Sequence, residues 1–121
     1  MSNRQSVIHA PSYVCLRGTM CWSLTLTAQN PLPYEGSTAI LTATANYDVG
    51  PTPWYIEIYD QTTGQQVCIA GSGTTCSASV EFSFATTQTY VAYVAASSST
   101  APPPSIQVAS NTTTIIWRTY P

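Results

Sequence analysis

Apolar and polar residues alternate along most of the chain from Trp22 onward. Between Trp22 and Ala28, large apolar residues alternate with serine and threonine, as in a strand with one buried face. The same two-residue period returns every 8–12 residues or so, and no segment keeps a helical period over two turns. The pattern predicts strands at Trp22–Ala28, Thr38–Asn46, Trp54–Tyr59, Gln65–Ala70, Thr74–Phe82, Thr87–Ala95 and Thr112–Trp117.

Glycine and proline separate these strands. Val49–Pro53 contains two prolines, which cannot donate to a strand ladder, and Asp60–Gly64 and Gly71–Gly73 are turns. A long Ser/Pro loop, Ala96–Ser105, includes three consecutive prolines that favour a fixed, extended shape. About seven short antiparallel strands with this spacing are typical of an all-β sandwich, and 121 residues make one domain.

The chain divides into an N-terminal arm, residues 1–21, and a sandwich domain, residues 22–121. The arm has no clean period, yet it holds two of the three arginines, the single histidine and the apolar pairs Val7–Ile8 and Tyr13–Val14. A disordered tail is usually poorer in such residues. We therefore expect contact to order the arm, either along an edge of its own sandwich or on a neighbouring subunit.

Four positions fit an immunoglobulin-like sandwich of about seven antiparallel strands. Trp54 opens the third strand 11 residues after the inward-facing Ala43, and Tyr90 lies two residues before the inward-facing Ala92. Immunoglobulin domains have a buried tryptophan on strand C and a corner tyrosine two residues before the second cysteine of strand F. Any other antiparallel sandwich or a jelly roll is the alternative. The expected core contains Trp54, Tyr90, Leu41, Ile56 and Val94.

Three segments, Leu41–Gly64, Gly71–Ser79 and Thr89–Val94, resemble a bacterial Ig-like module that recurs in surface-exposed proteins of actinobacteria, often in tandem. Asp48-Val-Gly-Pro-Thr-Pro53 is the most specific part of a resemblance that covers about residues 22–118. The resemblance implies an Ig-like fold and an extracellular or surface role, with no catalytic residues to carry over. Here a single copy stands in place of an array, and the N-terminal arm lies outside the match.

Charged residues are rare, and this limits the classes of function that the protein can have. Only 7% of the residues are charged, none is lysine, and the net charge is −2, while 14 serines and 19 threonines supply most polar positions. Three dispersed arginines cannot form the basic surface that nucleic acid requires. No apolar run approaches the roughly 18 residues that span a bilayer. The first residues also lack the apolar run of a secretory leader, so either a leader was removed or the chain is made and assembled in a cytoplasm.

Four cysteines, Cys15, Cys21, Cys68 and Cys76, make an even number that suits two disulfides. The C-x5-C and C-x7-C spacings do not match zinc sites, and the single histidine adds no fourth ligand, so we expect no metal. Cys68 and Cys76 flank the turn Gly71–Gly73, and a hairpin there would bring them together. We expect local pairing, Cys15 with Cys21 and Cys68 with Cys76, if the protein is oxidised.

Groups that could carry chemistry are isolated from one another. His9 has serines nearby but no acid, and Glu57 alternates to the outer face of its strand, where we expect a solvated carboxylate. Asn46 and Asp48 provide too few oxygens for calcium, and the glycosylation sequon at Asn111 carries little weight because such triplets occur by chance. The sequence therefore predicts no enzymatic activity and no cofactor.

Three tyrosines form the most suggestive surface feature. Tyr55 and Tyr59 point outward from the third predicted strand, and Tyr93 points outward from the sixth, which neighbours it in an immunoglobulin sandwich. Clustered tyrosines are common at interfaces, so they form a candidate binding patch. The alternative is the ordinary preference of aromatic residues for strands.

These observations favour a non-enzymatic structural or binding module. The first hypothesis is a decoration protein on the capsid exterior of a tailed phage, with the arm docked on the lattice of capsid subunits. Ig-like domains similar to bacterial surface modules also occur on such virions. The alternative is a secreted actinobacterial adhesion or carbohydrate-contact module that binds a cell-surface polymer. The expected location is the virion surface in the first case and the extracellular surface in the second.

Overall fold

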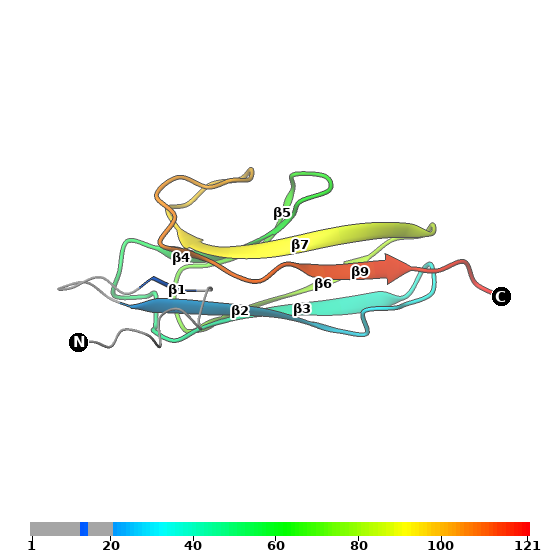
Figure 1. Ribbon diagram of the computed structural model, residues 1–121, viewed down its shortest axis with the longest axis horizontal. Coiled ribbons are helices and arrows are strands. Elements are labelled where there is room, and N and C mark those ends of the chain that lie inside the picture. Colours follow the sequence, from blue (N-terminus) through cyan, green and yellow to red (C-terminus); the bar gives the residue numbers. More distant parts are fainter. Residues whose placement is uncertain (1–12, 15–20) are drawn as a thin grey trace.

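The computed structural model describes the backbone of residues 13–14 and all of residues 21–121, and this part of the chain is entirely β-structure and irregular loops. Two antiparallel sheets lie face to face (Figure 1). The first has the order β1-β2-β3-β6. The second has the order β5-β4-β7-β8, and β9 also pairs with β7. The strands are β1 (Tyr13–Val14), β2 (Trp22–Gln29), β3 (Thr38–Ala45), β4 (Tyr55–Asp60), β5 (Gln66–Ala70), β6 (Thr75–Glu81), β7 (Thr86–Ala95), β8 (Val108–Ala109) and β9 (Thr113–Trp117).

The all-β class and the two-sheet sandwich are confirmed, because every segment with a two-residue period is a strand. The pattern does not predict β1 and β8, which are two residues long and so have no period to detect. In the described residues, no helix is long and apolar enough to span a bilayer.

The core fills the space between the sheets with the inward residues of each strand. Leu41, Ile56, Tyr90 and Val94 are completely buried there, as the alternation predicts. The largest fully buried side chain is Trp117, whose indole N–H donates to the carbonyl of Ser37 at 2.9 Å. The core also contains Trp22, Leu24, Leu26, Ala39, Ala43, Ala45, Val49, Ile58, Cys76, Val80, Ala92, Val108 and Ile115.

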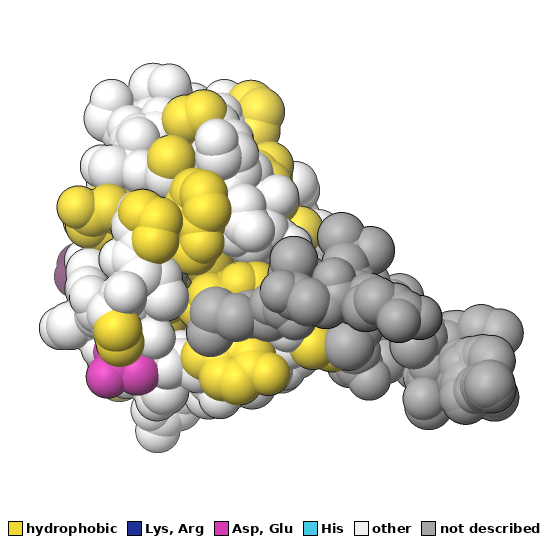
Figure 2. All heavy atoms as spheres, turned by 90° about the vertical axis from the view of Figure 1, so that its left-hand side faces the viewer, with side chains coloured by type: hydrophobic (Ala, Val, Ile, Leu, Met, Phe, Trp, Pro, Cys, Tyr) yellow, Lys and Arg dark blue, Asp and Glu magenta, His cyan; other side chains and the backbone are white. Residues whose placement is uncertain are grey.

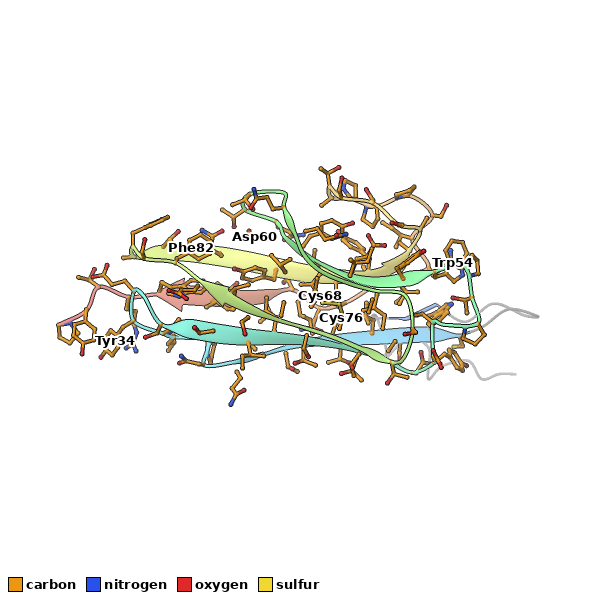
Figure 3. The ribbon with its side chains drawn as sticks, turned by 180° about the vertical axis from the view of Figure 1, so that it is seen from behind. Tyr34, Trp54, Asp60, Cys68, Cys76 and Phe82 are labelled. Carbon is orange, nitrogen blue, oxygen red and sulfur yellow. A yellow bond between two sulfur atoms is a disulfide. The ribbon has the colours of Figure 1, made fainter. Side chains whose placement is uncertain are left out.

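Trp54 is not the central core tryptophan that its spacing predicts. It precedes β4, and its backbone N–H donates to the Thr52 hydroxyl at 3.0 Å, so its main chain belongs to the preceding loop. The side chain packs only partly buried against one end of the core, opposite the end that holds Tyr34 (Figure 3). Trp117 and Trp22 fill the interior instead.

Cys68 and Cys76 form the predicted disulfide, with Cα atoms 6.3 Å apart, but they do not belong to one hairpin. β5 lies at the edge of one sheet and β6 at the edge of the other, so residues 71–74 cross between the sheets. The disulfide therefore links the two sheets at this open side (Figure 3). Cys76 pairs with Ala43, and Cys68 pairs with Ile58, which pairs with Ala92. The disulfide thus lies level with the two central alanines, one strand away from Ala43 in the first sheet and two strands away from Ala92 in the second.

Asn111 ties the opposite side of the sandwich together. Its Oδ1 accepts from the backbone N–H of Leu26 and its Nδ2 donates to the carbonyl of Leu26, both at 2.9 Å. The amide thus acts like a strand partner for β2 from the segment between β8 and β9. Because the Nδ2 atom that would carry a glycan makes this bond, the sequon reading has no support in the structure.

The described part of the N-terminal arm runs along its own sandwich. Tyr13 pairs with Ser23 and Val14 with Trp22, so β1 extends the first sheet beside β2. β2 begins at one end of the sandwich, and β9 finishes at the opposite end (Figure 1). Apolar and uncharged polar side chains make up most of the described surface at the end where β2 begins (Figure 2).

Candidate functional site

The three predicted surface tyrosines point away from the main core but do not form an exposed patch. Tyr59 is completely buried, and Tyr55 and Tyr93 are half-buried. The Tyr59 and Tyr93 rings make an edge-to-face contact with centroids 5.8 Å apart. Alternation correctly predicts the direction of these side chains, whereas their exposure was wrongly predicted, because another segment covers this face of the sheet.

The cover is the Ser/Pro segment 96–107, which joins β7 to β8 and is called the strap below. Figure 1 shows it in orange over the outer side of β4 and β7. Its ends are fixed by backbone bonds from Ala96 N–H to the Pro104 carbonyl and from Gln107 N–H to the Val94 carbonyl. Thr100 forms a bridge with Gln65 beside β5. The strap converts the outer face of this sheet into a second, smaller buried layer.

Glu57 lies in this layer and not in solvent, which corrects the prediction of a solvated carboxylate. Its side chain is completely buried. Oε1 accepts from the Tyr59 hydroxyl and, at 3.3 Å, from the side-chain N–H of Gln66. Oε2 has no hydrogen-bond partner among the described residues. The same two donors also reach the carbonyl of Ser98 in the strap.

Burial changes the titration of both groups. It raises the pKa of Glu57, and the hydrogen bonds from Tyr59, Ser98 and Gln66 oppose this rise only in part. Burial, together with the neighbouring Glu57, raises the pKa of Tyr59 to about 12. Tyr59 is therefore a neutral donor at any ordinary pH, and Glu57 is the group whose charge changes.

A second polar cluster closes the end of β4. The Asp60 carboxylate accepts from the backbone N–H groups of Thr62 and Thr63 at 2.8 and 3.2 Å, which fixes the turn after the strand. In the orientation that satisfies both neighbours, the Gln88 amide donates to Asp60 at 2.7 Å and accepts from the Thr86 hydroxyl. These bonds explain why an acid and an amide lie buried here: Asp60 fixes the turn, and Gln88 bonds to Asp60.

Tyr90 does not make the corner expected from its position in the immunoglobulin pattern. Its ring is buried in the core, and its hydroxyl lies beside the Asp60 carboxylate without a hydrogen bond of good geometry. Burial, and then the charge of Asp60, raises the pKa of Tyr90. The residue is near the middle of β7 and not at the start of the strand, so a corner bond to an upstream backbone group is out of reach.

Asp48 and Asn46 have structural partners. Asp48 accepts from the backbone N–H groups of Gly50 and Gly73 at 2.7 and 2.8 Å, and these bonds lower its pKa. Asn46 accepts from Ser23 N–H and donates to the Cys21 carbonyl. In residues 13–14 and 21–121, no group of three His, Cys, Asp or Glu side chains could hold a metal ion.

The outer face of the first sheet is a second candidate surface, which the sequence analysis did not single out. Thr25, Thr44 and Thr75 lie side by side on β2, β3 and β6. The next row on this face holds Thr27, Thr42 and Ser77, and the hydroxyls of Thr42 and Ser77 are 3.0 Å apart. The Thr-x-Thr pattern of the predicted strands is the signal that could have identified this uncharged, hydroxyl-bearing face.

Two candidate residues, His9 and Cys15, lie outside the described residues. Cys21 is disulfide-bonded, and Cys15, the partner predicted for it, falls in the undescribed part. Comparison with family models, with curated proteins and with solved structures finds no match to this chain. What the protein does must therefore be argued from the residues themselves.

Proposed function

We propose that the protein is a non-enzymatic, Ig-like module displayed on the exterior of a phage virion. In immunoglobulin lettering, β2, β3 and β6 take the places of strands A, B and E. The facing sheet, β5, β4, β7 and β9, takes the places of C′, C, F and G. This strand order and the two central alanines support the Ig-like assignment. The half-buried Trp54 and the missing tyrosine corner are departures from it.

The observation that carries the non-enzymatic part is how the carboxylates are used. Asp48 and Asp60 fix turns, Glu57 lies beneath the strap, and Glu35 accepts from the backbone N–H of Tyr120 at 3.2 Å. Only Glu81, of the five acids in the chain, is exposed and without such a partner in the described residues. An acid–base pair needs free groups within reach of a substrate, and these groups are committed to the fold.

The display part rests on surface chemistry and on the arm. The first sheet presents rows of uncharged hydroxyls, and β1 attaches the arm to β2 through strand pairing. This pairing fixes residues 13–14 at a defined edge of the sandwich, and we propose that the arm docks on a lattice of capsid subunits from there. No nucleic acid is involved in this proposal.

The disulfide is also compatible with the alternative, a secreted cell-surface module. A bond between Cys68 and Cys76 joins the two sheets, and disulfides persist in extracellular settings and on virion or cell surfaces. Both locations meet this requirement. A module on a cell wall would use the same hydroxyl face to contact a surface polymer.

Immunogold electron microscopy separates the two locations. Antibodies raised against the purified full chain are applied to phage particles and to the envelopes of uninfected cells from the same source. Gold on the outside of capsids supports the virion proposal, and gold on the cell envelope replaces it with the alternative. Labelling of neither surface overturns both, with preimmune serum as the control for nonspecific gold.

A further inference from the structure

The strap is held by donors that a buried carboxyl group also uses. The carbonyl of Ser98 accepts from the Tyr59 hydroxyl at 3.1 Å and from the Gln66 amide, and Glu57 Oε1 accepts from the same two groups. Tyr59 has one hydroxyl proton and can donate it to only one acceptor at a time. Glu57 and the Ser98 carbonyl therefore compete for the Tyr59 proton. The backbone of Ser98 also acts on Glu57 and favours its ionised form, but the effect of burial is larger and favours the neutral form.

The charge of Glu57 decides this competition. An ionised carboxylate is a stronger acceptor than a carbonyl oxygen, so it draws the Tyr59 proton away from Ser98. A neutral carboxyl group attracts that proton less, which leaves it to the strap. Oε2 has no partner among the described residues, so the ionised form is also incompletely solvated while the strap is closed.

Among the described residues, no cation is seen to offset the charge of Glu57. On its own strand the titratable neighbours are Tyr55 and Tyr59, and on β7 it pairs with Tyr93. β5 contributes the uncharged Gln66, and neither the strap nor β8 contains an ionisable side chain. Burying an unpaired carboxylate is costly, and protonation or opening of the strap each removes the cost.

We propose that the strap is a pH-sensitive cover, which closes on protonated Glu57 and loosens when Glu57 ionises. The sign follows from linkage: burial raises the pKa of Glu57 in the closed state above its ordinary value of 4.5. Closing therefore takes up a proton. The closed form is favoured most below pH 4.5 or so, and it loses this advantage as the pH rises through the closed-state pKa.

Opening the strap changes the surface of the protein. Tyr59 and Val91 are 0% and 3% exposed when the strap is closed, and both belong to the small buried layer and not to the main core. Release would present them to solvent together with Tyr93. The aromatic face that the sequence suggests as a binding patch would then exist only in the open state.

Hydrogen exchange of the full-length chain from roughly pH 4 to 8, corrected for the intrinsic pH dependence of exchange, tests this coupling. In the wild-type protein, protection of strap amides should fall as pH rises, about tenfold for each unit by which the pKa of Glu57 differs between closed and open states. Glu57→Gln should remove this fall. Glu81→Gln removes an exposed acid on β6 and should leave it unchanged.

Carbon-13 NMR of the wild-type protein gives a second test that does not depend on a variant's folding. The Glu57 carboxyl carbon and the strap amides should titrate with the same midpoint. Different midpoints, a pH-independent strap, or a fall that persists in Glu57→Gln would each overturn the proposal. These measurements do not involve any partner, so their outcome is separate from that of the immunogold experiment.

Discussion

Glu57 illustrates what alternation along a strand can and cannot predict. The two-residue period correctly predicts that Glu57 and Tyr59 face away from the main core. The period contains no information about a segment 39 residues further along the chain, where Ser98 accepts from Tyr59. The burial of this face is fixed by the strap, and neither alternation nor local propensity specifies where a long Ser/Pro loop folds back.

Tryptophan positions give the first residue-scale prediction. Replacing Trp117 with alanine should cost about 3–5 kcal/mol of unfolding free energy, because the ring is 1% exposed and its removal leaves a large cavity. Trp54→Ala should cost clearly less, because its ring is partly exposed at one end of the core. Urea denaturation of the two variants measures the difference. A larger loss for Trp54→Ala would contradict the arrangement of the core described above.

Asn111 gives the second residue-scale prediction. Asn111→Ala should destabilise the protein by about 1–3 kcal/mol, because it leaves the backbone N–H of Leu26 without its acceptor. The carbonyl of Leu26 keeps the hydroxyl of Thr113 at 3.0 Å as a donor. Thr112→Ala alters the same sequon at an exposed side chain and serves as the control in urea denaturation. Equal stability of the two variants would refute the bridging role.

At the scale of elements, the sequence predicts the strands well and their partners less well. Gly71–Gly73 has the composition of a hairpin turn, and Cys68 and Cys76 do pair across it. The strands on either side nevertheless join different sheets, because β5 finds its partner in β4 and β6 finds its partner in β3. A hairpin within one sheet and a crossover between two sheets are both compatible with the same turn residues. The choice depends on packing of the whole sandwich, which a short window of sequence does not contain.

The disulfide gives the prediction at this scale. The double variant Cys68→Ala, Cys76→Ala should lose about 2.5 kcal/mol of unfolding free energy, from the chain-entropy cost of closing a loop over a sequence separation of 8. Alanine replacement leaves the disulfide of Cys21 in place, which reduction would not. Denaturant midpoints of the variant and the oxidised wild type measure the loss. No loss would mean that packing alone holds β5 against β6.

For the whole molecule, composition and period are sufficient to predict an all-β sandwich, since β2, β3, β4 and β7 alternate with the predicted phase. Function is predicted less completely from the same information. Binding depends on which sheet faces stay uncovered, and the outer faces of the two sheets differ. The strap covers the outer face of β4 and β7, whereas the outer face of β2, β3 and β6, with its rows of threonine and serine, stays exposed. In the described part of the chain, the hydroxyl face is thus a sheet face that stays available to a partner.

The arm provides the prediction at this scale. A chain that starts at Trp22 should fold, because the described core begins at that residue and, of the described strands, the deletion removes only the two-residue β1. If the arm docks on a capsid lattice, the shortened chain should fail to co-sediment with capsids that the full chain binds. Circular dichroism and a urea transition establish that the shortened chain is folded before it is tested.

A matched variant separates loss of the arm from loss of the hydroxyl face. Thr25→Lys, Thr44→Lys in the full chain introduces charge at the centre of the rows on β2 and β3 and leaves the arm intact. If the arm anchors the protein, this variant should still sediment with capsids while the shortened chain stays in the supernatant. The reverse result, with the shortened chain bound and the lysine variant free, would assign attachment to the hydroxyl face, because the only change there is charge on otherwise uncharged strands.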